Sequence, residues 1–91
     1  MRNLKTADLI QRAQDTLLSF LVIELQTGSV FVELAKTRNK PTQLERRMAL
    51  KKSAQVAALN VERLKDELHD EDSRHCIEGQ LAELDRAIRA L

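Results

Sequence analysis

Apolar side chains recur along the first part of the chain at the spacing of an α-helix. No Pro occurs between residues 3 and 39, and Gly28 is the only residue there that strongly weakens a helix. A rotation of about 100° per residue places one set of side chains on a face roughly 80° wide. These are Ile10, Ala13, Leu17, Leu21, Glu24, Gly28, Phe31 and Ala35. We therefore predict a first helix over about residues 7–38, with Thr6 as its N-cap.

The middle of this helix is apolar over more of its circumference than one face. Additional apolar side chains occur on both flanks of the predicted stripe. Two neighbouring helices cover only part of such a surface, and a contiguous apolar patch left in water marks an interface. We therefore predict self-association through the first helix. The residues expected at this interface are Leu18, Val22 and Leu25 on one flank, or Ile23 on the other.

A turn at Pro41 separates the first helix from a second one. Proline disfavours the helical conformation of the residue before it and lacks a backbone N–H, so the first helix is expected to end near Asn39. Thr42 and Glu45 have the spacing of a capping box, which predicts a second helix over about residues 43–69. Its expected apolar face comprises Leu44, Met48, Ala54, Ala57, Ala58, Val61, Leu64 and Leu68, with Leu50 on the flank.

An acidic second turn, residues 69–73, precedes a third helix. The Asp and Ser side chains of this turn can cap the helix that follows. The third helix is predicted over about residues 71–90, because apolar side chains alternate at spacings of four and three, as on the seam of a bundle. They are Ile77, Leu81, Leu84, Ile88 and Leu91. The sequence thus predicts one all-α domain, a three-helix antiparallel bundle in which a shorter third helix completes a long hairpin.

Small residues occur where the two arms of the hairpin would approach each other. In an antiparallel hairpin Gly28 lies opposite Ala54, so Gly28 is expected to pack against Ala54 or a residue within one turn of it, with close contact also at Phe31. The pattern Gly28-x-x-Phe31, followed by Ala54-x-x-x-Ala58-x-x-Val61, resembles the helical hairpin of the tetratricopeptide (TPR) family. The resemblance covers this hairpin only, and the early Trp and terminal Pro of the repeat are absent. It implies a protein-interaction scaffold.

Charge is unevenly distributed, although the formal net charge is only +1. Residues 36–52 hold seven basic side chains against Glu45 alone, whereas residues 62–85 hold nine acidic and three basic ones. In the predicted bundle these regions lie at opposite ends, which predicts a rod with opposite charges at its tips. The basic patch comprises Lys36, Arg38, Lys40, Arg46, Arg47, Lys51 and Lys52.

The candidate chemistry is sparse. A basic patch can bind phosphates, but this one has no aromatic residue to stack on bases, and the acidic tip repels polyanions, so nucleic acid is disfavoured. His69, His75 and Cys76 are poorly spaced for a metal ion. The sequence holds no Gly-rich phosphate loop and no His-Glu-x-x-His motif. We expect no catalytic activity, no cofactor and no metal site.

Cellular location and membrane association follow from two further features. The single cysteine, Cys76, forms no intramolecular disulfide, which favours the cytoplasm. The longest uncharged apolar run, residues 16–23, is far shorter than the roughly 20 residues that cross a bilayer, so no membrane association is expected. We interpret the chain as a cytoplasmic helical interaction or assembly module that self-associates, with another protein as a further candidate partner. The alternative is an RNA- or DNA-binding accessory protein that uses residues 36–52.

Overall fold

The computed structural model describes residues 2–38 and 40–91, with side chains from residue 6 onward. Asn39, where the sequence predicts the end of the first helix, lies outside the described residues. The described chain forms α-helices joined by short 3₁₀ turns. The helices are α1 (Arg2–Lys36), α2 (Leu44–Leu64) and α3 (Glu71–Arg89), and the 3₁₀ turns are η1 (Pro41–Gln43) and η2 (Lys65–Glu67).

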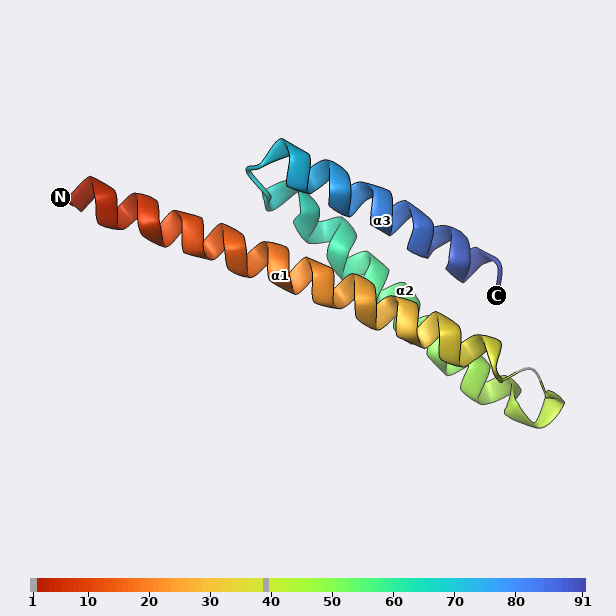
Figure 1. Ribbon diagram of the computed structural model, residues 1–91. Coiled ribbons are helices and arrows are strands. Elements are labelled where there is room, and N and C mark those ends of the chain that lie inside the picture. The colour runs from red at the N-terminus through yellow and green to blue at the C-terminus, as the bar shows by residue number, and fades with distance from the viewer. Residues whose placement is uncertain (1, 39) are drawn as a thin grey trace.

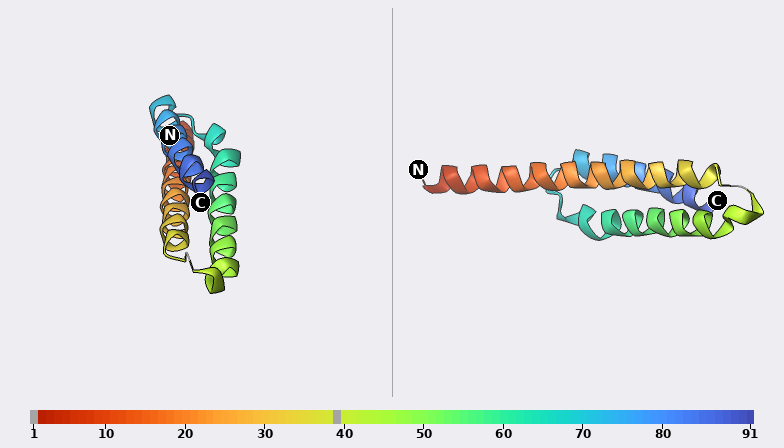
Figure 2. Two further views of the ribbon diagram at one scale, coloured as in Figure 1. Left: turned by 90° about the vertical axis from the view of Figure 1, so that its right-hand side faces the viewer. Right: turned by 90° about the horizontal axis from the view of Figure 1, so that it is seen from below.

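The helices pack side by side into a rod measuring 63 × 18 × 16 Å. α1 and α2 form a long antiparallel hairpin, and α3 folds back along the pair (Figure 1). Because α1 is much longer than its neighbours, its N-terminal part projects beyond the turn between α2 and α3 (Figure 2). Side chains 6–13 are exposed at every position. The predicted all-α fold is confirmed: three helices pack together, and α1 and α2 form a hairpin.

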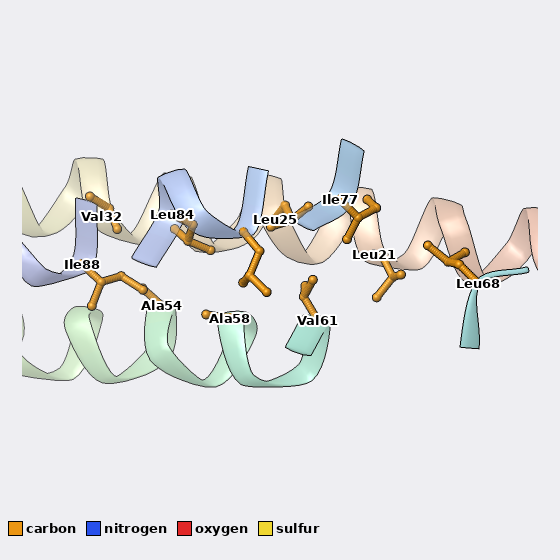
Figure 3. Packing of buried hydrophobic residues seen from close by; sticks show 11 residues of the cluster. Leu21, Leu25, Val32, Ala54, Ala58, Val61, Leu68, Ile77, Leu84 and Ile88 are labelled. Carbon is orange, nitrogen blue, oxygen red and sulfur yellow. The ribbon is translucent and has the colours of Figure 1, made fainter. Parts of the chain in front are cut away.

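The core lies where the three helices meet (Figure 3). α1 contributes Leu21, Leu25 and Val32, while α2 contributes the small Ala54 and Ala58, which let its backbone approach closely. The predicted seam of α3 is confirmed, because its apolar residues are all buried or packed against the core. They are Ile77, Leu81, Leu84, Ile88 and Leu91.

Four residues predicted on the buried faces are exposed instead. Ile10 and Ala13 lie on the projecting part of α1, where no other element of the described chain covers them. Leu44 and Met48 are exposed on α2, because a rotation of about 100° per residue places Met48 about 120° from Ala54. The buried face of α2 is therefore carried mainly by small residues.

The starts of α1 and α2 differ from the predicted capping. α1 begins before Thr6, so this residue lies inside the helix and is not its N-cap. At α2 the N-cap position is occupied by Gln43, and no side chain makes a capping hydrogen bond. The predicted capping box of Thr42 and Glu45 is therefore wrong. The 3₁₀ turn that starts at Pro41 leads into α2 instead, since the fixed φ of proline suits a first helical position.

The second turn is ordered by side-chain hydrogen bonds. The Asp70 carboxylate accepts hydrogen bonds from the Ser73 hydroxyl (2.6 Å) and backbone N–H (3.1 Å), and these hold the pKa of Asp70 below its usual value of 3.8. The Gln14 side chain links this turn to α1, donating to the Glu67 carbonyl (3.1 Å) and accepting from the His69 N–H (2.7 Å). The prediction that an Asp or Ser of the turn caps the third helix is confirmed.

Candidate interaction surface

A mainly apolar stripe runs along the side of α1 that α2 and α3 leave largely uncovered. At about 100° per residue its centre lies about 130° around α1 from the centre of the buried face. Its large members are between 40% and 63% exposed. We call this surface the outer stripe. It comprises Leu9, Ala13, Thr16, Phe20, Ile23, Thr27, Val30 and Leu34.

Two grooves of different character flank the outer stripe. The groove between α1 and α2 includes the apolar side chains of Phe31 and Val56 in its lining. The groove between α1 and α3 has two acidic side chains, Glu33 and Glu83, in its lining. The groove between α1 and α2 is therefore mainly apolar, although Glu24 and Lys52 also line it, and the groove between α1 and α3 carries two negative charges.

The residues predicted for self-association differ in how exposed they are in the structure. Leu25 is buried in the core, and Leu18 and Val22 are half-buried against it. Ile23 lies on the outer stripe and is 57% exposed. Of the two flanks considered from the sequence, the one that carries Ile23 is open, because α3 packs over the other.

Sequence reasoning missed the C-terminal half of this surface. Val30 and Leu34 are exposed and continue the line of Phe20 and Ile23 at alternating spacings of three and four. This spacing is the signal that identifies them, because side chains related in this way share one side of a helix. The stripe is therefore a second apolar seam on the same helix.

Gly28 lies at a three-way contact between the helices. A Cβ atom added at Gly28 would lie 2.7 Å from Leu84 Cδ2 of α3 and 3.4 Å from Ala57 Cβ of α2. Ala54, the partner expected from the sequence, is fully buried about one turn before Ala57. Phe31 is half-buried and packs against the core. The close approach to α2 involves Ala57, which lies within one turn of Ala54 as the sequence predicts, whereas α3 contributes Leu84, which the hairpin pattern did not indicate.

Glu24 is the one acidic residue on the predicted core face of α1. Its side chain is half-buried, and Oε2 accepts a hydrogen bond of 3.1 Å from Asn60 Nδ2 of α2. The carboxylate is therefore held by a neutral amide at the edge of the hairpin, in the groove where Phe31 also lies.

The basic patch combines residues that stabilise the fold with residues that face solvent. Arg47 Nη2 donates to the backbone oxygen of Leu91 (2.7 Å), which links α2 to the end of α3. Lys36 Nζ lies 3.1 Å from Glu33 Oε1 within α1. Lys40, Arg46 and Lys52 are exposed, and Arg38 and Lys51 are half-buried. Only part of the patch is therefore free to meet a ligand without disturbing the fold.

The acidic end contains one well-paired cation. Lys65 Nζ lies 3.4 Å from Glu78, 3.5 Å from Asp66 and 3.9 Å from Glu62. Desolvation lowers the pKa of Lys65, but the attraction of these three carboxylates outweighs it, so the pKa is raised. Lys65 stays protonated and partly neutralises the acidic turn, which is not the predicted tip of the rod because α1 projects beyond it (Figure 2).

Among the described side chains, no group of three His, Cys, Asp or Glu residues is placed to hold a metal ion. Cys76 is exposed and unpaired with another cysteine. Comparisons with protein-family models, curated proteins and solved structures find no match to this chain.

α1 also satisfies the length and composition expected of a membrane span. The segment Thr6–Lys36 is long and apolar enough to cross a membrane, although only 22% of its most apolar window is buried in the bundle. The estimate from the sequence considered only the uninterrupted apolar run and did not detect this. A core helix of a soluble protein and a signal sequence near the N-terminus pass the same test.

Proposed function

We propose that this protein is a helical assembly module that associates with itself through the outer stripe of α1. One observation carries the proposal: large apolar side chains, 40% to 63% exposed, form a line on a face of α1 that the protein's own bundle leaves uncovered. Removing apolar surface from water contributes about 25 cal/mol per Å², so covering several such side chains stabilises a complex by several kcal/mol per chain. Contiguous exposed patches of this kind are typical of interaction sites.

The projecting part of α1 supports the same function. Residues 6–13 are exposed throughout, and an isolated helical segment of this length has little stability of its own in water. A partner that lies along α1 would cover this segment together with the outer stripe. The resemblance of the hairpin to a TPR unit implies the same general class, a protein-interaction scaffold.

Sedimentation equilibrium of the full chain from low to high micromolar concentration tests the proposal. The mass is expected to rise with concentration from that of a 10.4 kDa chain toward that of a dimer. A single 10.4 kDa species at the highest concentration would contradict it.

A matched pair of variants tests the surface. The double change Ile23→Gln and Val30→Gln is expected to weaken association by about 100-fold or more, because each large aliphatic side chain contributes about 1.5–3 kcal/mol when buried. The control is Leu59→Gln on α2, where a side chain of similar exposure (49%) borders the groove between α2 and α3. This control should associate like the unmodified chain. Equal weakening by both would show that the association does not use the outer stripe.

Two other classes of partner, nucleic acid and a membrane surface, would give different experimental results. Binding through phosphate contacts falls steeply with salt, so tight, salt-sensitive retention of the chain on a polyanion resin would favour nucleic-acid binding by the basic patch. Co-sedimentation with uncharged phospholipid vesicles, lost in the double variant, would assign the outer stripe to a membrane surface. We expect neither result.

A further inference from the structure

We infer that two copies of the chain pair along the outer stripe in antiparallel orientation, with Phe20 of each copy opposite Ile23 of the other. This inference rests on the proposed function, and it specifies the partner, a second copy, and the register. From Leu9 to Leu34 the stripe alternates spacings of four and three, which are the core positions of a heptad repeat. A helix with this repeat packs its seam against a similar seam.

One register matches the whole stripe. Reversing one helix places the first core position of each heptad against the second core position of its partner. With Phe20 opposite Ile23, every other member of the stripe also meets a member, and none is left against solvent. The further layers are Thr16 with Thr27, Ala13 with Val30, and Leu9 with Leu34.

The projecting part of α1 is covered in this register. Leu9 and Ala13 of one copy lie along the half of the second copy's α1 that its own bundle supports. Ile10, which is half-exposed and has no core to join in its own chain, comes within two residues of the level of Phe31 of the second copy, on the same flank of the seam. Phe31 borders the apolar groove between α1 and α2, so this side chain meets apolar surface.

Charged residues beside the stripe are complementary in the same register. Arg12 of one copy comes within two residues of the level of Glu33 of the other, on the flank of the seam at the groove between α1 and α3 that also includes Glu83. Within their own chain both residues make only exposed local pairs, Arg12 with Asp8 (3.2 Å) and Glu33 with Lys36 (3.1 Å), which can rearrange at little cost.

The distribution of charge along the rod favours antiparallel over parallel pairing. A parallel pair in register would place the two basic patches, residues 36–52, side by side at one end. Like charges so arranged repel each other. The antiparallel pair carries the two patches to opposite ends of the dimer.

Site-specific cross-linking tests the register. In a Cys76→Ser background, Ala13→Cys and Val30→Cys are prepared as two separate single variants and treated with a bis-maleimide shorter than a helix diameter, about 10 Å. Neither variant should cross-link alone, because seventeen residues, or about 25 Å of helix, separate like positions in the antiparallel pair. The mixture should give cross-linked dimers that contain one chain of each kind. Leu59→Cys, mixed with either variant, is the control and should not cross-link.

The outcomes separate this inference from the function on which it rests. If the unmodified chain sediments as a monomer, the proposed function fails before any cysteine is introduced. A dimer whose single variants each cross-link with themselves is parallel, and a dimer whose mixture does not cross-link has another register. Either result overturns this inference alone.

Charge exchange gives a second readout of the same contact. Arg12→Glu is expected to weaken dimerisation several-fold by facing Glu33 with a like charge, and the added change Glu33→Arg should restore it. Restoration would not occur if Arg12 acted only within its own helix, where Asp8 is its neighbour. Absence of rescue would therefore contradict the register.

Discussion

The two apolar faces of α1 have similar side chains and opposite environments. The inner face, with Leu21, Leu25 and Val32, is closed by α2 and α3 to an exposure of 4% or less. The outer stripe carries Phe20 and Ile23 on the same turns of the same helix, yet these side chains stay 40% and 57% exposed. Apolar content therefore identifies α1 as a helix that needs neighbours, whereas the placement of α2 and α3 decides which face they cover.

Truncation of one side chain from each face should give the largest difference. Leu21→Ala is expected to lower the free energy of unfolding by about 2–5 kcal/mol, because it opens a cavity in a fully buried site. Ile23→Ala, studied where the chain is monomeric, should change it by only about 0.5 kcal/mol. Urea denaturation at low protein concentration measures both. Similar losses would show that the outer stripe is buried within a single chain.

Enlarging the two glycines sharpens the comparison between packed and open positions. Gly28→Leu is expected to cost about 1–3 kcal/mol, because even a Cβ atom there meets Leu84 at 2.7 Å. Gly79→Leu should instead stabilise α3 by about 0.5–1 kcal/mol, since a Cβ at that position meets nothing within 4 Å and leucine favours helix. Melting temperatures report both effects. An unchanged value for Gly28→Leu would contradict the three-way contact.

The smallest expected effect comes from the cap of α3, which lies apart from both faces of α1. The Ser73 hydrogen bonds lower the folded-state pKa of Asp70 below 3.8, so their stabilisation is present above that pH and is lost as the pH falls through the lowered pKa. Ser73→Ala removes the hydroxyl donor and should reduce this acid-induced loss. The measurement is the melting temperature of both proteins from neutral to acidic pH. Identical pH profiles would show that the hydroxyl contributes nothing to the cap.

The sequence predicted elements with a single apolar face better than elements with two. The seam of α3 was identified residue by residue, because Ile77, Leu81, Leu84 and Ile88 leave only one face to bury. α1 has two faces, and the helical period alone cannot say which of them α3 covers. Which face of α1 is covered depends on the direction in which the second turn sends α3. This direction is set by contacts between residues far apart in the sequence, and the spacing of apolar residues within one helix does not contain it.

The same reasoning explains which parts of the candidate surface were found. Ile23 is predicted at the interface because the centre of α1 is apolar over more than one face, but Leu25, the alternative on the other flank, is buried in the core. Val30 and Leu34 were missed because polar residues separate them from the apolar centre. Ile10 has the spacing of the buried face and is therefore predicted in the core. It is exposed because the second turn lies level with a later part of α1, so that neither α2 nor α3 reaches Ile10.

The opposite environments of the two faces also imply that folding of one chain and association of two chains occur one after the other. Consecutive helices joined by short turns make contacts of low sequence separation, a topology that folds quickly and at a rate independent of protein concentration. Under the proposed pairing, the outer stripe is covered only in a second-order encounter, whose half-time lengthens on dilution. A refolding experiment at several protein concentrations would therefore show one phase with a constant rate, the closing of the inner face, and a later phase whose rate is proportional to concentration.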